Sequence, residues 1–251
     1  MSVAGRTALI TGGGNGLGAA IAQALHGAGA QVVLVGRRPE PLQQVCTELS
    51  SRARWYSCDV ADPGSVTALA EELADTEISI VINNAGVAGP VAPLTEIEVA
   101  DWDEVFDINV RGVFLICKAF LPPMVQRGAG DVINIASVSG KRPLVRRTPY
   151  CASKMAVIGL TSTLAFEVGP AGVNVNTLSP GPVVGARMDR NFRLEAERTG
   201  TSYAAARETF VSRAALGRMI TEEEVGAAVV AMLAMPGLCG ADVDLSAGMV
   251  A

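Results

Sequence analysis

A tyrosine and a lysine stand four residues apart in the segment PYCASK, at Tyr150 and Lys154. Residues at this spacing share one face of a helix, so a phenol and an ammonium can lie side by side. A free phenol has a pKa of about 10, and a neighbouring positive charge stabilises the phenolate. Such a pair can give a proton to a carbonyl oxygen, or take one from an alcohol, while a hydride moves to or from a nicotinamide. The spacing alone is common, so this chemistry depends on what the fold brings beside it.

A glycine-dense turn near the start of the chain is the second feature. The segment TALITGGGNGLGAA reads as a strand, a turn and a helix, with Gly12, Gly16 and Gly18 at the tight positions. Glycine lets backbone approach a pyrophosphate closely, and the free N–H groups at a helix start attract its charge. No Gly-Lys-Ser/Thr follows, which argues against a P-loop. We expect this turn to bind a dinucleotide; a turn that serves only packing is the alternative.

The end of the second expected strand indicates which dinucleotide is preferred. An NAD site places an acidic side chain there, to bind the ribose 2′-hydroxyl. Here the segment reads VVLVGRRPE, so Gly36 occupies that place and Arg37 follows. A guanidinium can pair with a 2′-phosphate, which a carboxylate would repel. The sequence therefore favours NADP; the alternative is that Arg37 and Arg38 are solvated surface charges.

Short apolar runs alternate with longer helical patterns along the chain. The runs are TALIT, VVLVG, ISIVINNAG, DVINIAS and VNVNTLSPG; the helices begin at Leu17, follow Pro41, span Trp102 to Phe120 and pass through Lys154. This order, with runs apolar on both faces, predicts an α/β domain with a parallel sheet between two helix layers. No linker or repeat interrupts it, so we expect one doubly wound domain over residues 1–251. The polar stretch 187–218 is expected to be a helical segment that covers the substrate, or else a plain pair of surface helices.

The composition argues against several classes of function. Hydrophobic residues make up 49% of the chain, enough for a large core and for subunit contacts. The net charge is −5 and the basic residues are scattered, so we expect no nucleic-acid partner. Five cysteines without a C-x-x-C pair argue against disulfides and against a metal site. We see no apolar run near the roughly 20 residues of a membrane span, and expect a cytoplasmic protein.

Taken together, these features resemble the short-chain dehydrogenase/reductase family over nearly the whole chain. Separate motifs occur in the family's order: TGGGNGLG, CDV with Asp59, NNAG from Asn83 to Gly86, INVRG with Asn109, INIAS with Ser137, YCASK, and LSPGPV from Leu178 to Val183. The resemblance implies a single Rossmann-type domain with a mainly parallel seven-stranded sheet. It also implies a homotetramer or homodimer, for which the apolar helices around Phe114 and Ala156 are candidates.

The resemblance further implies roles for individual residues. Tyr150 would be the general acid/base, and Ser137 would orient and polarise the substrate carbonyl; an uncharged hydroxyl can do so without competing for the proton. Lys154 would bind the nicotinamide ribose and tune the tyrosine, and Asn109 would hold a water that links the lysine to solvent. Asp59 and Val60 resemble the family's adenine pocket, Asn83 the residue that braces the sheet under the cofactor, and Pro180 with Gly181 the wall beside the nicotinamide. The expected cofactor-binding residues are Gly12, Asn15, Gly16, Leu17, Gly18, Arg37, Asp59, Val60, Asn83, Ala85, Gly86, Tyr150, Lys154, Pro180, Gly181 and Val183.

The loop before Tyr150, VSGKRPLVRRTP, carries Lys141, Arg142, Arg146 and Arg147. One hypothesis is that this cluster selects an anionic substrate, since fixed positive charge in a cleft concentrates anions. Solvated or subunit-contact charges are the alternative. We therefore expect an NADP-preferring oxidoreductase that interconverts a small secondary alcohol and a ketone. The same reaction with NAD, and a regulator that binds a dinucleotide without turnover, remain as alternatives.

Overall fold

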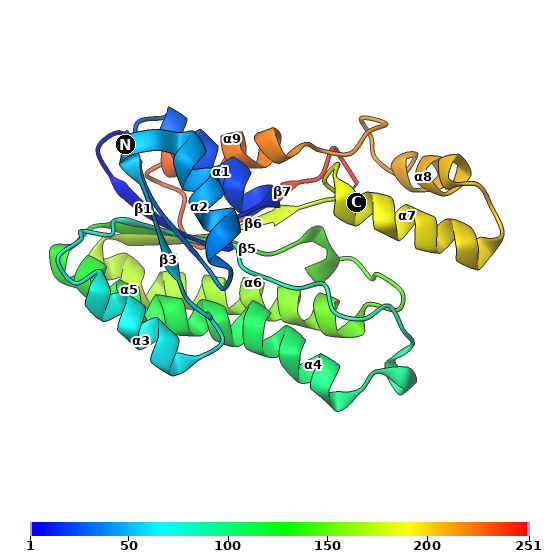
Figure 1. Ribbon diagram of the computed structural model, residues 1–251, viewed down its shortest axis with the longest axis horizontal. Helices are drawn as coiled ribbons and strands as arrows, with labels where there is room; N and C mark the ends of the chain where they lie inside the picture. The colour runs from blue at the N-terminus through cyan, green and yellow to red at the C-terminus, as the bar shows by residue number, and fades with distance from the viewer. Residues whose placement is uncertain (1, 250–251) are drawn as a thin grey trace.

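A computed structural model describes residues 2–249, apart from the side chains of residues 186 and 187. The predicted domain, residues 1–251, runs past the described residues at both ends. Within them, seven strands form one sheet in the order β3-β2-β1-β4-β5-β6-β7, and every neighbouring pair is parallel (Figure 1). The strands are β1 Thr7–Thr11, β2 Gln31–Gly36, β3 Ala53–Ser57, β4 Ile80–Asn83, β5 Gly130–Ile135, β6 Val173–Pro180 and β7 Asp242–Leu245.

Helices cover both faces of this sheet (Figure 1). One layer contains α1 Gly16–Gly27, α2 Pro39–Leu49 and α9 Glu222–Leu233. The other contains α3 Pro63–Glu72, α4 Val99–Phe106, α5 Gly112–Arg127 and α6 Thr148–Val168. Two further helices, α7 Ala186–Thr199 and α8 Tyr203–Val211, extend to one side of the sheet, after the carboxyl end of β6.

Each face of the sheet has its own apolar core. Ala8 and Ile10 of β1 belong to the cluster under α1 and α9, whereas Leu9 between them belongs to the cluster over α5 and α6. All three side chains are fully buried. A central strand between two helix layers is apolar without alternation, which is why its sequence reads as a continuous run. The predicted fold class, a single Rossmann-type α/β domain, is confirmed.

Two strands, β3 and β7, lack the apolar run that marks the other five. They are the edges of the sheet, and β3 exposes Arg54 and Trp55. An edge strand is covered less completely than a central one, so its sequence need not be continuously apolar. The helix predicted from Trp102 to Phe120 is also longer and is interrupted, because a π-helical turn, Asp107–Arg111, separates α4 from α5.

Two helical stretches, Val99–Arg127 and Thr148–Ala171, are long and apolar enough to cross a membrane by length and composition. This differs from the expectation that no segment approaches that length. Within their apolar windows, 50% and 33% of the residues are buried inside the protein. Both stretches contribute residues to the core on one face of the sheet.

A capping box begins α9. The Thr221 hydroxyl accepts a hydrogen bond from the Glu224 N–H at 3.2 Å, and the Glu224 carboxylate accepts one from the Thr221 N–H at 2.9 Å. Arg218 donates to both oxygens of the same carboxylate, at 2.8 and 2.6 Å. The Arg218 guanidinium, assisted by the Thr221 N–H, lowers the pKa of Glu224 to about 2.

Replacing Glu224 with glutamine should therefore destabilise the protein near neutral pH and much less in acid. The charged carboxylate stabilises the folded state above its ordinary pKa of 4.5, and this contribution is lost as the pH falls toward about 2. Urea unfolding at several pH values between about 7 and 3 should show a gap between the wild type and Glu224→Gln that narrows with acid. Glu71→Gln, on an exposed position of α3, is the control. A gap of constant size would contradict this account.

Candidate active site

The glycine turn between β1 and α1 is bound to the end of β2. The N–H groups of Gly12 and Gly13 donate to the Val35 carbonyl oxygen at 2.7 and 3.3 Å. Gly12 and Gly16 have φ angles of +67° and +51°, which favour glycine. A Cβ on Gly18 would lie 2.1 Å from the Gly12 carbonyl oxygen, so a side chain there would force the backbone to move. Two further predicted residues stand exposed or half-buried at the start of α1: Asn15 and Leu17.

The loop after β4 is tied to this turn. The Thr11 hydroxyl accepts hydrogen bonds from the N–H groups of Asn84 and Ala85, both at 3.0 Å. The Asn84 side chain donates to the carbonyl oxygens of Thr11 and Gly12, at 3.0 and 3.3 Å. Two predicted residues, Gly12 and Ala85, are thus brought together. Thr11 and Asn84, which make the link, are not in the predicted set, although both stand inside quoted motifs.

The residues predicted for the adenosine end lie at the carboxyl ends of β2 and β3. Gly36 is paired in register with Ser57, whose hydroxyl donates to the Arg37 carbonyl oxygen at 3.2 Å. This contact holds the backbone of Arg37 beside the end of β3, with its side chain exposed. The ends of β2 and β3 therefore lie side by side, and Arg37 next to them carries a guanidinium instead of a carboxylate.

Asp59 and Val60 follow β3 directly. One Asp59 carboxylate oxygen accepts from the Ala61 N–H at 3.0 Å, and the Asp59 N–H donates to the Ser65 hydroxyl at 3.0 Å. Val60 is buried and lies so close to Gly112 of α5 that a Cβ there would come within 2.8 Å of its methyl group. These contacts fix the backbone at the position predicted for the adenine pocket.

Tyr150 and Lys154 lie together on α6. The lysine Nζ is 5.9 Å from the centroid of the phenol ring and donates to the Ile135 carbonyl oxygen, at the end of β5, at 2.8 Å. Lys154 is buried and Tyr150 half-buried. The short segment after Ser137 packs directly on the helix, because a Cβ on Gly140 would lie 3.0 Å from the Lys154 carbonyl carbon. The end of β5 and the start of α6 thus bring the predicted tyrosine, lysine and serine to one region.

Asn109 lies in the π-helical turn between α4 and α5 and is buried, with 1% of the residue exposed. Its amide oxygen accepts from the Val87 N–H at 2.8 Å, and its amide nitrogen donates to the Val87 carbonyl oxygen and to the Ser153 hydroxyl, both at 3.0 Å. Ser153 in turn donates to the Tyr150 carbonyl oxygen at 2.8 Å. Asn109 therefore connects the loop after β4 to the tyrosine helix. Ser153 is a connecting residue that the sequence prediction omits, although it lies inside YCASK.

The ends of β5 and β6 meet at Ser137. Its hydroxyl oxygen lies 3.5 Å from the Pro180 carbonyl oxygen and accepts a hydrogen bond from the Ser139 N–H at 3.1 Å. Gly181 follows at a close approach of two segments, because a Cβ there would lie 2.8 Å from the Cα of Ser246. Val183, the last predicted residue of this wall, is half-buried.

Asn83 lies beneath this region. Its amide donates to the Asn134 amide oxygen on β5 at 2.8 Å, and Asn134 donates to the Thr161 hydroxyl on α6 at 2.8 Å. Asn83 thus belongs to a buried line of polar groups across β4, β5 and α6, and its role as a brace under the cofactor stays a prediction. These three side chains are uncharged, so their hydrogen bonds are formed without placing an ion in the core.

The basic loop before Tyr150 is divided between several contacts. Lys141 forms ion pairs with Asp242, at 2.8 Å, and with Asp244 of β7. Burial lowers the pKa of Lys141, but hydrogen bonds to the two carboxylates outweigh this and raise it overall. Arg142 donates to the Met249 carbonyl oxygen at 2.7 Å. These two cations therefore hold the loop to the C-terminal part of the chain, and they do not support the hypothesis that the whole cluster selects an anion.

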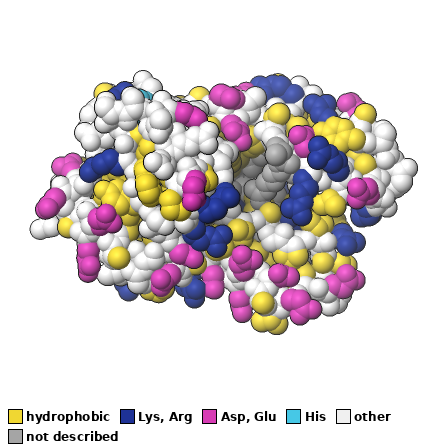
Figure 2. Space-filling view, in the orientation of Figure 1, with side chains coloured by type: hydrophobic (Ala, Val, Ile, Leu, Met, Phe, Trp, Pro, Cys, Tyr) yellow, Lys and Arg dark blue, Asp and Glu magenta, His cyan; other side chains and the backbone are white. Residues whose placement is uncertain are grey.

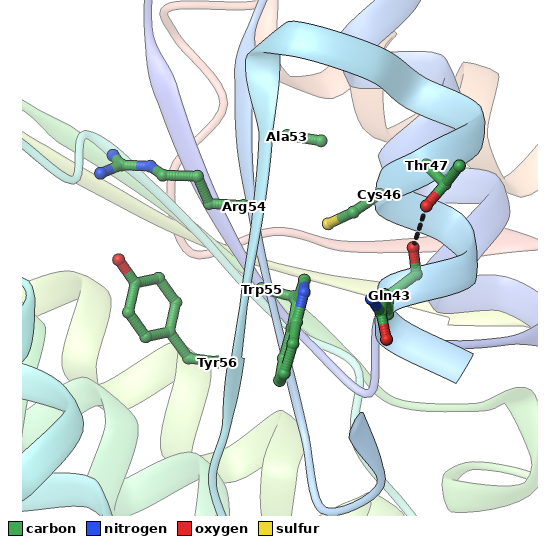
Figure 3. A pocket seen from close by; sticks show the side chains of 7 residues that line it. All are labelled: Gln43, Cys46, Thr47, Ala53, Arg54, Trp55 and Tyr56. Atoms are coloured by element: carbon green, nitrogen blue, oxygen red, sulfur yellow. Dashed lines mark hydrogen bonds between the residues drawn. The ribbon is translucent and has the colours of Figure 1, made fainter. Parts of the chain in front are cut away.

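A pocket of about 500 Å³ lies away from these residues, between α2 and β3 (Figure 3). Trp55 and Tyr56 line it from the strand, and Gln43 and Cys46 line it from the helix. None of its lining residues belongs to the predicted site. Figure 2 shows Lys and Arg side chains, with Asp and Glu side chains among them, near the middle of the visible face, over the region between α2 and α7. Among residues 2–249, no group of three His, Cys, Asp or Glu side chains is placed to hold a metal ion.

The chain is similar in sequence to known proteins. The family described as short chain dehydrogenase matches residues 6–197. D-threitol dehydrogenase of Mycolicibacterium smegmatis is 40% identical over 185 residues, covering 72% of this chain and 71% of that protein.

Two solved structures cover nearly the whole chain. NAD+-bound xylitol dehydrogenase superposes with a TM-score of 0.92 at 27% identity, covering 99% of this chain and 100% of that one. L-sorbose reductase from Gluconobacter frateurii, complexed with NADPH and L-sorbose, superposes with a TM-score of 0.91 at 26% identity, covering 100% of this chain and 99% of that one.

Replacing Asn109 with alanine should destabilise the fold by about 1–3 kcal/mol, because it leaves the N–H and C=O of Val87 without the amide that pairs both. Asn109→Asp should also destabilise, since its second oxygen would face the Val87 carbonyl. Urea unfolding at neutral pH measures both effects, with Gln43→Ala on the exposed side of α2 as the control. An unchanged midpoint for both Asn109 variants would show that the turn does not depend on this amide.

Proposed function

The chain belongs to the short-chain dehydrogenase/reductase family, as an NAD(P)-dependent enzyme that acts on CH–OH groups, and we propose that it prefers NADP and a small secondary alcohol or its ketone. The observation that carries the proposed reaction at a secondary alcohol or ketone is the placement of Tyr150 beside the buried ammonium of Lys154, at the carboxyl end of β5. In a doubly wound sheet this edge is where ligands bind, next to the point at which the strand order reverses between β1 and β4.

We assign the proton transfer to Tyr150. In reduction, its hydroxyl gives a proton to the carbonyl oxygen of the substrate, and in oxidation the phenolate takes the proton of the alcohol. The reduced cofactor supplies the hydride that reaches the carbonyl carbon. Ser137 donates a hydrogen bond to the same substrate oxygen, and Lys154 stabilises the phenolate and binds the nicotinamide ribose.

Asn109 has a supporting part in this scheme. Its side-chain amide is hydrogen-bonded to Val87 and Ser153. We therefore propose that the backbone of the π-helical turn, and not this side chain, binds the water of the proton relay. A π-helical turn widens the hydrogen-bond pattern of a helix, and such turns often stand at functional sites. The water would connect the Lys154 ammonium to solvent, so that the tyrosine can be reprotonated between turnovers.

The cofactor cradle follows the ends of the strands. The residues that we assign to it run from the pyrophosphate turn, through the adenosine end, to the nicotinamide wall: Gly12, Asn15, Gly16, Leu17, Gly18, Arg37, Asp59, Val60, Asn83, Ala85, Gly86, Tyr150, Lys154, Pro180, Gly181 and Val183. Positive φ angles at Gly12 and Gly16 and the lack of room for a Cβ at Gly18 support a backbone cradle for phosphate. Arg37, exposed beside Gly36, supports NADP, because a 2′-phosphate bound at the ends of β2 and β3 needs a cation beside it.

Two alternatives stay open to test. One relative in the solved structures is NAD+-bound and another is complexed with NADPH, so membership of the family does not choose between the cofactors. The second alternative is a dinucleotide-binding regulator without turnover. A sensor has no need of a tyrosine, a lysine and a serine at one strand end, which favours the enzyme.

For the substrate, we propose a small polyol or its ketose. The similar proteins include a D-threitol dehydrogenase, a xylitol dehydrogenase and an L-sorbose reductase. An anionic substrate is less well supported, because Lys141 and Arg142 are held elsewhere. A panel of neutral polyols with their acid counterparts, followed at the absorbance band of reduced nicotinamide, tests the class; turnover of acids alone would overturn it.

We further propose that residues 187–218 cover the substrate and that the protein is a cytoplasmic homotetramer or homodimer. The hairpin of α7 and α8 follows the nicotinamide wall directly, which supports a covering role. Phe114 on α5 and Phe166 on α6 are 49% and 84% exposed, so these two helices carry apolar side chains that a second subunit could cover. Light scattering of the purified protein gives its mass in solution; a monomer would remove this part of the proposal.

Replacing Tyr150 with phenylalanine should lower kcat by about 10²–10⁴-fold, since the ring keeps its packing but loses the transferable proton. Cofactor binding, followed by the fluorescence of NADPH, should change little. Cys151→Ala, at the adjacent position of α6, is the control. Undiminished turnover in Tyr150→Phe would end the proposed chemistry, whereas cofactor binding without turnover in the wild type would favour the regulator.

Exchanging Arg37 for aspartate should reverse the cofactor preference. The kcat/KM with NADP should fall by about 10–100-fold, because a charge-assisted pair is lost and a carboxylate opposes the 2′-phosphate, while NAD should gain. Arg54→Asp, an equal charge change on the exposed edge strand β3, is the control. An unchanged ratio of NADP to NAD would mean that the 2′-phosphate lies elsewhere.

A further inference from the structure

The loop before Tyr150 is joined to α7 by one arginine. Arg147 stands at the start of α6, and one of its terminal nitrogens donates to the carbonyl oxygens of Ala88 and Gly89, at 3.2 and 3.3 Å. Its other terminal nitrogen donates to the Asn191 amide oxygen on α7 at 3.0 Å. From its position at the start of the tyrosine helix, the guanidinium of Arg147 therefore contacts two other parts of the chain, the loop after β4 and the α7–α8 hairpin.

The α7–α8 hairpin has a small core of its own. Phe192 is 3% exposed and packs edge to face against Tyr203 and Phe210 of α8, with ring centroids 6.0 and 5.5 Å apart. The Tyr203 hydroxyl donates to the Asp189 carboxylate on α7 at 2.6 Å. These contacts hold α7 to α8, so the two helices can move together as one body.

The hairpin is held to the rest of the domain at its base. The N–H groups of Ala215 and Leu216 donate to the carbonyl oxygens of Gly248 and Ala247, at 3.3 and 3.0 Å. Val183 pairs with Ile220 in a single parallel bridge, supported by hydrogen bonds from Val184 N–H to Ile220 and from Ile220 N–H to Pro182, at 2.9 and 3.1 Å. Between this bridge and the helices stand Gly185 and Gly217, with φ angles of +152° and +61°. Glycine adopts such angles at little cost, so the connection at Gly185 can serve as a hinge. Gly217 lies between two bonded segments, at Ala215–Leu216 and at Ile220.

The charge of a second arginine of the loop, Arg146, also acts on α7. Glu195 is one helical turn after Asn191 and shares its face. The pKa of Glu195 is lowered chiefly by its hydrogen bond to Arg198 on the same helix, and the charges of Arg213 and Arg146 act in the same direction. Arg146 itself donates to the Val91 carbonyl oxygen at 3.5 Å, so the direct contact of this loop with α7 is the one that Arg147 makes with Asn191.

We propose that Arg147 and Asn191 form a latch that holds the α7–α8 hairpin against the loop before Tyr150, and that Arg147 is a positioning residue for substrate binding. This inference rests on the proposed function, because it takes the hairpin as the cover of the substrate. It replaces the hypothesis that Arg147 binds an anionic substrate: the fork of the guanidinium is directed at two backbone carbonyls and an amide of the protein itself.

The latch acts on binding more than on the chemical step. Arg147 does not touch the reacting atoms through any of these three contacts, and Tyr150 keeps its place on α6 whether the hairpin is open or closed. A hairpin that stays open binds substrate less tightly, because part of the binding energy must then close it. Loss of the latch should therefore raise KM and leave kcat nearly unchanged.

Asn191→Ala isolates the latch, since it leaves the contacts of Arg147 with Ala88 and Gly89 in place. Its KM for substrate should rise about fivefold to tenfold, with kcat changed less than about threefold. Arg147→Met should do the same, and the double variant should be no worse than Arg147→Met alone, because both changes remove one interaction. Asn191→Asp keeps an acceptor for the guanidinium and should retain the wild-type KM. Arg207→Met, an exposed cation on α8, is the control.

Amide hydrogen exchange gives a readout that needs no turnover. Exchange in residues 188–211 should speed up in Asn191→Ala and Arg147→Met and stay at the wild-type rate in Asn191→Asp and Arg207→Met. Unchanged exchange and unchanged KM in Asn191→Ala would overturn the latch, even if Arg147→Met is impaired through the loop after β4. If exchange responds as expected but the wild type turns over no alcohol or ketone, the latch stands and the proposed function falls.

Discussion

A buried ammonium must have fixed acceptors around it, because only hydrogen bonds and compensating charge offset its removal from water. Lys154 is 6% exposed and meets this need with the last carbonyl of β5. The hydrogen bond from Lys154 to this carbonyl fixes the distance between α6 and the sheet. It also restricts which side chains the loop after β4 can carry. A Cβ on Gly86 would lie 3.6 Å from the lysine Nζ and 3.0 Å from the Asn109 amide oxygen, so that loop passes between them as bare backbone.

Uncharged amides and hydroxyls, more than ion pairs, join the strand ends into one site. Asn84 ties the loop after β4 to the glycine turn, Asn109 ties it to the tyrosine helix, and Asn83 ties β4 to β5 beneath. An amide can accept from an N–H and donate to a C=O at once, as Asn109 does with Val87. A carboxylate or an ammonium could satisfy only one of the two. These uncharged side chains therefore form the framework around the Lys154 ammonium and the phenol of Tyr150.

The sequence predicts the parts of this site that depend on local pattern. The glycine turn, the five central strands and the pair on α6 are readable because each rests on residue type, apolar run length or a spacing of one helical turn. The edge strands β3 and β7 are not, since partial cover removes the pattern. Contacts between distant residues are equally hidden: nothing near Lys141 indicates that Asp242 will pair with it, and nothing near Arg147 indicates Asn191. The same four-residue cationic motif therefore reads as one cluster in sequence and as separate attachments in space.

The π-helical turn at Asp107–Arg111 has an effect beyond the residue it presents. One additional residue in a helix rotates everything that follows by about 100°. The turn that aims Asn109 at the loop after β4 therefore also sets which side of α5 faces outward, where Phe114 stands half exposed. Removing a residue from the turn would retract the amide and swing the phenylalanine round the helix axis together. The direction of the buried Asn109 amide and the outward face of α5 are therefore set by the same turn, and a change in its length alters both.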